Sequence, residues 1–172
     1  MVPSFLKLTV LAAVVALAAA HCPPYWTAYM DSCFQIFNRP STWEEAEQYC
    51  MGFSTCEGNQ VGHLASIGDV GTNGFITKYK RLIEAQGPVR VWIGLNDQTF
   101  EGNFEWSNGA NVTFTHWERG QPNNAQGQEN CVTLTGVSSS DPSRWDDANC
   151  LQQMAFVCEL PGIDPRAQHQ IW

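Results

Sequence analysis

Two polar stretches of this chain end in cysteine and carry its best candidate ligands for a metal ion. The first is GQPNNAQGQENC, residues 120–131, and the second is RWDDANC, residues 144–150. Neither stretch has the periodicity of a helix or of a buried strand. Their amide and carboxylate side chains include those of Gln121, Asn123, Glu129, Asp146 and Asp147. Calcium accepts such oxygens, roughly six to eight of them, in irregular geometry, so these residue types suit a calcium site.

A few regular elements are expected to position these oxygens. Ser41-Thr42-Trp43-Glu44 matches a capping box, with Ser41 at the cap and Glu44 three residues on, and predicts a helix over about residues 42–53. A second helix is predicted from near Thr72 to before Gly87, with Leu82 on its apolar stripe. Strands are predicted at residues 89–95, 104–106, 131–134 and 155–160. Little else between about residues 96 and 150 is periodic, so a long functional or clamped loop region is expected.

The N-terminus has the composition of a secretory signal peptide. Lys7 precedes an apolar run over residues 8–18, and Ala18-Ala19-Ala20 offers a cleavage site, so residues 1–20 are interpreted as a removed signal, with an uncleaved anchor as the alternative. The mature chain then keeps eight basic and seventeen acidic residues, a net charge of −9. This balance argues against a nucleic-acid partner and predicts a soluble, secreted, extracellular protein without a membrane span.

Seven cysteines follow the predicted signal: Cys22, Cys33, Cys50, Cys56, Cys131, Cys150 and Cys158. A secreted route favours disulfides over zinc, because the chain has no paired Cys-x-x-Cys and no nearby pair of histidines. Spacing alone does not determine which cysteines pair, and one of the seven must be left over.

Seven short motifs follow one another along residues 22–160. They are Trp43-Glu44-Glu45-Ala46, His63-Leu64-Ala65-Ser66-Ile67, Trp92-Ile93-Gly94-Leu95, Gln121-Pro122-Asn123, Glu129-Asn130-Cys131, Trp145-Asp146-Asp147 and Phe156-Val157-Cys158-Glu159. In this order and at this spacing they resemble the C-type lectin-like domain family. Residues 21–160 are therefore expected to form one such domain, followed by a short C-terminal tail over residues 161–172.

The resemblance implies an α+β fold with two helices, two small antiparallel sheets and a long loop region stapled by disulfides. It implies the pairs Cys50–Cys158 and Cys131–Cys150, and a Cys22–Cys33 pair at an N-terminal hairpin. Cys56 has no partner in the family. It predicts an interchain bridge in a disulfide-linked homodimer, or otherwise a free or capped thiol.

The resemblance also implies that the five oxygen-bearing residues form a primary calcium site. In the family a cis proline, here Pro122, directs the side chains on either side of it to the ion, and Asp147 gives both its carboxylate and its backbone carbonyl. The ion in turn accepts two vicinal hydroxyls of a sugar, so the expected function is calcium-dependent glycan binding, as in recognition or agglutination of glycan-coated cells in innate immunity.

Two departures from the family pattern concern the choice of sugar. Mannose-type members have Glu-Pro-Asn and galactose-type members Gln-Pro-Asp, each with a later Trp-Asn-Asp, whereas this chain has Gln-Pro-Asn and Trp-Asp-Asp. Glu129, Asp146 and Asp147 keep the carboxylate count at three. Asn124-Ala125-Gln126 provides no aromatic ring for a galactose face, which favours a mannose-like or broad preference.

Three further expectations concern other positions. The family's auxiliary calcium site maps to Asp97, Glu101, Asn124 and Asn130, and with only two acids among them a second ion is not expected. Asn111-Val112-Thr113 is an N-glycosylation sequon. No nucleophile, base and orienting group form a catalytic set, so no enzyme activity is expected. The alternative function is an extracellular matrix or biomineralisation protein on the same fold.

Overall fold

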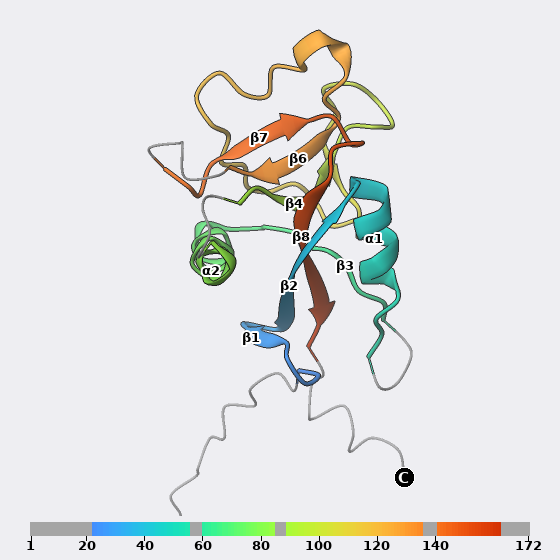
Figure 1. The fold of residues 1–172 in the computed structure, drawn as a ribbon, viewed down its shortest axis with the longest axis vertical. Helices are drawn as coiled ribbons and strands as arrows, with labels where there is room; N and C mark the ends of the chain where they lie inside the picture. Colours follow the sequence, from blue (N-terminus) through green and yellow to red (C-terminus); the bar gives the residue numbers. More distant parts are fainter. Residues whose placement is uncertain (1–21, 56–59, 85–88, 136–140, 163–172) are drawn as a thin grey trace, which may run out of the picture.

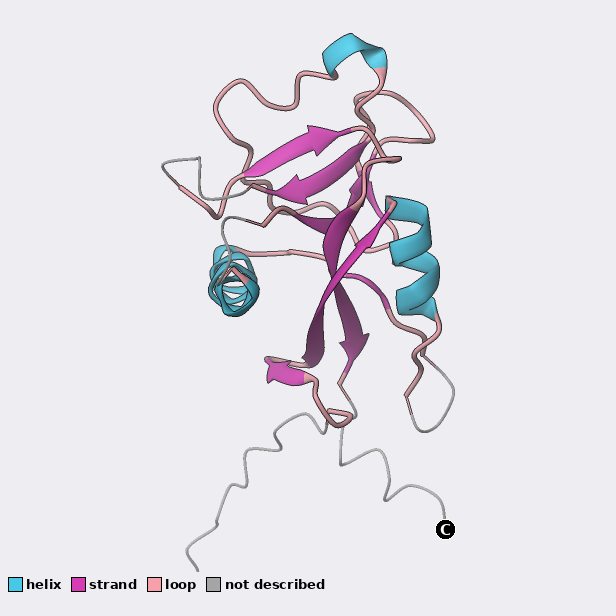
Figure 2. Ribbon diagram, in the orientation of Figure 1, coloured by secondary structure: helices cyan, strands magenta, loops and turns pink. Residues whose placement is uncertain are grey.

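The fold is a twisted sheet with one helix on either side. The computed structural model describes residues 22–55, 60–84, 89–135 and 141–162. Its elements are β1 (Thr27–Tyr29), β2 (Ser32–Ser41), α1 (Trp43–Met51), β3 (His63–Leu64), α2 (Val70–Lys80), β4 (Val91–Asn96), β5 (Glu105–Trp106), β6 (Cys131–Leu134), β7 (Trp145–Ala148) and β8 (Met154–Pro161), with short 3₁₀ turns at Arg81–Ile83 and Ala125–Gly127. Helix α1 and helix α2 lie on opposite sides of the long β2–β8 pair (Figures 1 and 2).

The sheet has two antiparallel parts joined by one short parallel contact. Strands β1, β2, β8 and β3 form the first part, and β5, β4, β6 and β7 form the second. The parts meet where β4 pairs with β8 in parallel, at Val91 with Ala155 and Trp92 with Phe156. The expected α+β class with two small sheets is therefore confirmed, with the addition that the two sheets are continuous.

Strand β4 lies at the centre of the molecule and is buried along its whole length. Because successive side chains of a strand point to opposite faces, Val91, Ile93 and Leu95 pack into a cluster on the α2 side, and Trp92 packs with Trp43 of α1 on the other. The indole N–H of Trp43 donates to the Ile93 carbonyl at 2.9 Å. A Cβ at Gly94 would lie 2.7 Å from the Leu64 carbonyl oxygen, so the motif needs glycine there for close packing of the backbones.

The first helix begins one residue later than its sequence pattern predicts. Thr42, not Ser41, is the N-cap: its hydroxyl accepts the Glu45 N–H at 3.3 Å, and the Glu45 carboxylate accepts the Thr42 N–H at 2.9 Å. Ser41 is instead the last residue of β2, and its carbonyl accepts the Trp92 indole N–H at 2.9 Å. Two overlapping capping patterns exist in the sequence, and the tertiary contact with Trp92 selects the second.

The second helix starts at Val70, before the predicted Thr72, because Asp69 caps it. The Asp69 carboxylate accepts the N–H groups of Gly71 and Thr72 at 2.6 and 3.0 Å. The α-helix ends at Lys80, and Leu82, which was predicted to lie on its apolar stripe, is 74% exposed in the following 3₁₀ turn. At the end of the helix, the fully buried Lys80 ammonium donates to the carbonyls of Val89 and Thr135 and pairs with the Glu84 carboxylate.

Replacing Asp69 with alanine is expected to lower the free energy of unfolding by about 1 kcal/mol at neutral pH. The hydrogen bonds from Thr72 lower the pKa of this carboxyl below its ordinary value of 3.8. The cap therefore stabilises the fold above about pH 4, and its contribution is lost as pH falls through the lowered folded-state pKa. Urea unfolding of the parent protein and of Asp69→Ala at pH 7 and pH 3 measures this effect. A stability difference between them that is equal at the two pH values would contradict the assignment of Asp69 as the cap. Asp31→Ala, at an exposed position, is the control.

Three disulfides join Cys22 to Cys33, Cys50 to Cys158 and Cys131 to Cys150, the pairs that the resemblance implied. The second closes a separation of 108 residues and ties α1 to β8, and the third closes 19 residues and ties β6 to the segment after β7.

Several expectations concern parts of the chain outside the described residues. The predicted signal peptide, Cys56 and residues 163–172 of the tail all lie there, so these stay predictions. Within the described part, no helix has the length and apolar character needed to span a bilayer.

Candidate functional site

The two polar stretches lie at one end of the molecule, in the β6–β7 hairpin and in the long loop that arches over it (Figure 1). Residues 144–150 were expected to lie in a loop, and this prediction is wrong: residues 145–148 form strand β7, paired with β6 from Leu134–Trp145 to Cys131–Ala148. The adjacent Asp146 and Asp147 interrupt the apolar alternation by which a strand is recognised in a sequence.

Trp145 anchors strand β7 in the hydrophobic core. It is fully buried, and its indole N–H donates to the Asn73 side chain of α2 at 2.8 Å. Its ring makes edge-on contacts with Trp106, Phe114 and Trp117, at centroid distances of 5.7 to 5.9 Å. This cage of aromatic rings fixes the strand segment from which the next two residues, both aspartates, project.

Asp147 organises the loop above the hairpin. Its side chain is buried, and its carboxylate accepts the Asn123 N–H at 3.0 and 3.1 Å and the Asn124 N–H at 2.7 Å. The negative charge is therefore held against two consecutive backbone amides of the loop. This contact brings residues 123 and 147 together, as the resemblance implied for one site.

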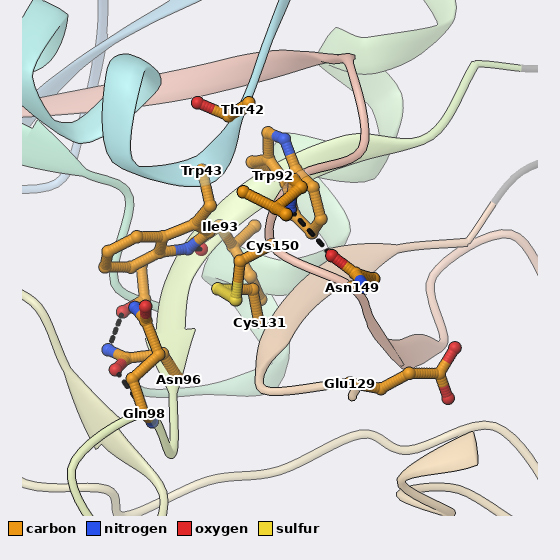
Figure 3. The surroundings of a disulfide bond; sticks show 12 residues. Thr42, Trp43, Trp92, Ile93, Asn96, Gln98, Glu129, Cys131, Asn149 and Cys150 are labelled. Carbon is orange, nitrogen blue, oxygen red and sulfur yellow. Dashed lines mark hydrogen bonds between the residues drawn. A yellow bond between two sulfur atoms is a disulfide. The ribbon is translucent and has the colours of Figure 1, made fainter. Parts of the chain in front are cut away.

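Glu129 closes the same loop from its other end. Its carboxylate accepts the Ala125 N–H at 2.9 Å, and its own N–H donates to the Asn124 side-chain oxygen at 3.0 Å. Figure 3 shows the Glu129 carboxylate directed away from the neighbouring Cys131–Cys150 disulfide and from the tryptophans packed there. The disulfide thus holds Glu129 and the segment after β7 in register at the base of the loop.

Gln121 supplies an oxygen that has no partner within the described residues. The Gln121–Pro122 peptide bond is cis, as expected. The Gln121 side-chain carbonyl oxygen is buried and accepts no hydrogen bond from the described part of the chain. A buried amide oxygen left unpaired costs free energy, and a cation at this position would satisfy it. The orphaned oxygen beside the Asn123–Asp147 contact therefore fits a calcium site.

Asp146 departs from this grouping. Thr133 of β6 lies opposite Asp146, and Trp92 of β4 lies opposite Thr133, so these residues share one face of the sheet while Asp147 faces the other way. Arg90, two residues before Trp92, reaches over this face and its guanidinium bonds the Asp146 carboxylate at 2.5 Å.

The electrostatics of Asp146 reflect both its burial and its neighbours. Burial raises the pKa of its carboxyl above the ordinary value, the Arg90 guanidinium opposes this shift, and the charges of Asp147, Glu129 and Glu118 add to it. Asp146 thus lies within electrostatic range of the other two carboxylates, although it does not join them: no three His, Cys, Asp or Glu side chains of the described segments gather as a metal cluster. The candidate site instead combines two carboxylates with the amides of Gln121 and Asn123.

A second set of unpartnered oxygens lies at the mapped auxiliary site. Asp97 is 2% exposed, and one of its carboxylate oxygens accepts the Gly102 N–H at 2.7 Å while the other has no partner in the described ranges. The side-chain oxygen of Asn130 is likewise buried and unpaired. The Asp97 N–H donates to the Asn130 carbonyl at 3.1 Å, which places the two residues side by side. A second ion was not expected here, because only two of the four mapped residues are acidic. That count takes no account of buried oxygens left without a partner in the described ranges.

Arg90 and Thr133 are two further residues at the candidate site that were not expected from the sequence. Nothing in their residue types or spacing connects them to Asp146, because their contacts depend on the register of three strands. Asn111 of the predicted sequon is exposed, and the Thr113 hydroxyl donates to the Gly68 carbonyl at 3.2 Å.

Comparison with known proteins agrees with this arrangement. Residues 39–160 match the family model described as "Lectin C-type domain". The chain is 38% identical over 143 residues to the alpha-N-acetylgalactosamine-specific lectin of Patiria pectinifera, covering 81% of this chain and 82% of that protein. The crystal structure of the C-type lectin CEL-I from Cucumaria echinata is similar with a TM-score of 0.74 and 31% identity, over 80% of this chain and 96% of that one.

A second similar structure has a different described role. It is a calcium-independent type II antifreeze protein, with a TM-score of 0.69 and 28% identity, over 84% of this chain and 98% of that one. The fold therefore does not by itself imply calcium. The family match over most of the chain, together with the three disulfides and the loop held on Asp147, shows that this chain belongs to the C-type lectin domain family.

Proposed function

We propose that this protein is a secreted lectin that binds glycans through a calcium ion. Gln121, Asn123, Glu129 and Asp147 provide the oxygen ligands, with Asp146, which points to the opposite face of β7 from Asp147, as a further donor. The unpaired, buried oxygen of Gln121 next to the Asp147-held loop is the observation that carries the proposal. A bound calcium ion supplies open coordination positions for two vicinal sugar hydroxyls, and the ligand side chains can hydrogen-bond the same hydroxyls.

The choice of sugar is part of this proposal. The Patiria pectinifera relative is named for N-acetylgalactosamine, whereas Asn124-Ala125-Gln126 carries no aromatic ring beside the motif of this chain. On the residues alone we propose a mannose-like or broad preference over galactose. Glycan recognition or agglutination in innate immunity is the proposed role, strengthened if Cys56 links two chains, because two weak sites on one particle gain from avidity.

Two unpaired oxygens favour a second ion at Asp97 and Asn130 as well. Desolvating an ionised carboxylate without a full set of partners is costly, and a cation bound there would offset this cost. Calcium titration of the purified protein by calorimetry should then fit two ions per chain, and Asp97→Asn should reduce the number to one.

The experiment that tests the lectin function is a glycan array probed with the mature protein, once in calcium and once in chelator. Binding that disappears in chelator and is eluted by free sugar supports the proposal. Absence of binding in both conditions would favour the second candidate function, an extracellular matrix or biomineralisation protein. The acidic composition and the similarity to a calcium-independent antifreeze protein are the observations in favour of that alternative. We propose no enzymatic activity, since the proteins compared above are described as two lectins and an antifreeze protein.

A further inference from the structure

Arg90 makes three hydrogen bonds at the edge of the candidate site. Its guanidinium nitrogens donate to the Thr133 hydroxyl at 3.1 and 3.2 Å and to the Asp146 carboxylate at 2.5 Å. The two charged side chains are 35% and 22% exposed, so the ion pair is only partly screened by water. The Thr133 hydroxyl lies on the strand between Arg90 and Asp146 and orients the guanidinium toward the carboxylate.

This contact occupies the acid that distinguishes the Trp145-Asp146-Asp147 motif of this chain. A carboxylate bonded to a guanidinium keeps little of its charge available to a second cation, and the guanidinium itself repels a divalent ion a few ångströms away. Within the described part of the chain, the Asp147 and Glu129 carboxylates instead accept hydrogen bonds from backbone N–H groups, which carry no net charge.

We propose that Arg90 sets the calcium affinity of the site by competing with the ion for the Asp146 carboxylate. The inference rests on the proposed calcium site. Arg90 is then a positioning residue that weakens calcium binding. The weaker site suits the calcium concentrations outside cells, where extracellular modules bind calcium with a Kd of about 0.1 to 1 mM. Asp146 then joins the site only when it leaves Arg90.

The test is calcium titration by isothermal calorimetry on the full mature protein and on Arg90→Gln. Removing the guanidinium is expected to lower the calcium Kd about three- to tenfold, because a partly exposed charge contact is lost and a like-charge repulsion is removed with it. In Arg90→Gln/Asp146→Asn this gain should disappear, because the released carboxylate is no longer present. Arg144→Gln is the matched control: the Arg144 guanidinium donates to the Asp141 carboxylate at 3.0 Å and to the Trp117 carbonyl at 3.3 Å instead of to Asp146, and its loss should leave the Kd unchanged.

If Arg90→Gln folds poorly, as a denaturation curve measured in chelator would reveal, a second variant provides the test. Thr133→Val removes the hydroxyl that orients the guanidinium while preserving the buried shape, and a decrease in Kd of about twofold is expected.

The outcomes separate the two proposals. If the parent protein binds calcium and Arg90→Gln binds equally or more weakly, the competition is refuted while the lectin proposal stands. If neither protein binds calcium, both proposals fail. Binding only by Arg90→Gln would support competition in its strongest form.

Discussion

Asp147→Ala is expected to abolish calcium-dependent sugar binding and to loosen the loop over residues 121–129. The Asp147 carboxylate accepts backbone N–H groups from Asn123 and Asn124 while fully buried, so its removal takes away a ligand and also leaves two amides without their acceptor. Hydrogen bonds to a charged group are worth about 1.5–3 kcal/mol each, which predicts at least about a 100-fold loss of affinity. Glycan-array binding and calcium calorimetry measure this effect.

Glu129→Gln separates charge from loop geometry in the same site. The amide oxygen of glutamine can still accept the Ala125 N–H that Glu129 accepts at 2.9 Å, so the free energy of unfolding in chelator should change by less than about 0.5 kcal/mol. Loss of the negative charge should nevertheless remove calcium binding. Undiminished binding in both Asp147→Ala and Glu129→Gln would refute the site, and Asp31→Asn, in the exposed β1–β2 turn, is the control for a charge lost elsewhere.

Removal of two different disulfides is expected to separate stability from binding. By loop entropy, the Cys50–Cys158 bond, which closes 108 residues, contributes about 4.7 kcal/mol, and the Cys131–Cys150 bond, which closes 19, about 3 kcal/mol. Replacing both cysteines of the first pair by serine should therefore cost more stability. Replacing the second pair should cost more sugar affinity. That bond ties Cys131, which follows Glu129 and Asn130, to Cys150, at the end of the segment that carries Asp146 and Asp147.

Urea denaturation and calcium-dependent glycan binding, measured on both double variants, test this ordering. Binding has to be compared well below the unfolding midpoint of each variant, so that loss of folded protein does not count as loss of affinity. A larger affinity loss in the Cys50–Cys158 variant than in the Cys131–Cys150 variant would contradict the role assigned to the second bond.

Much of the architecture could be predicted from short segments of the chain. The strand at residues 131–134 and both helices were expected close to where they occur, because apolar periodicity, caps and β-branched runs act over a few residues. The order of the seven motifs was sufficient to imply the family and the three disulfide pairs that the structure contains.

The errors arose where a tertiary contact overrides a local pattern. Ser41 and Thr42 are both acceptable caps, and the bond from the Trp92 indole to the Ser41 carbonyl assigns Ser41 to the preceding strand. Residues 145–148 look like a loop because two adjacent aspartates interrupt the alternation, yet pairing with β6 and burial of Trp145 make them a strand.

The candidate site, like the fold, could be predicted only in part from the sequence. Residue types and motif spacing determined which side chains could bind calcium, because oxygen ligands are recognisable from sequence. Only the tertiary structure decided how they are used: it places Asp147 on two backbone amides, leaves oxygens of Gln121, Asp97 and Asn130 unpaired among the described residues, and gives Asp146 to Arg90. Residues 90 and 146 are 56 positions apart, and their contact depends on the register of β4, β6 and β7, which no local pattern encodes.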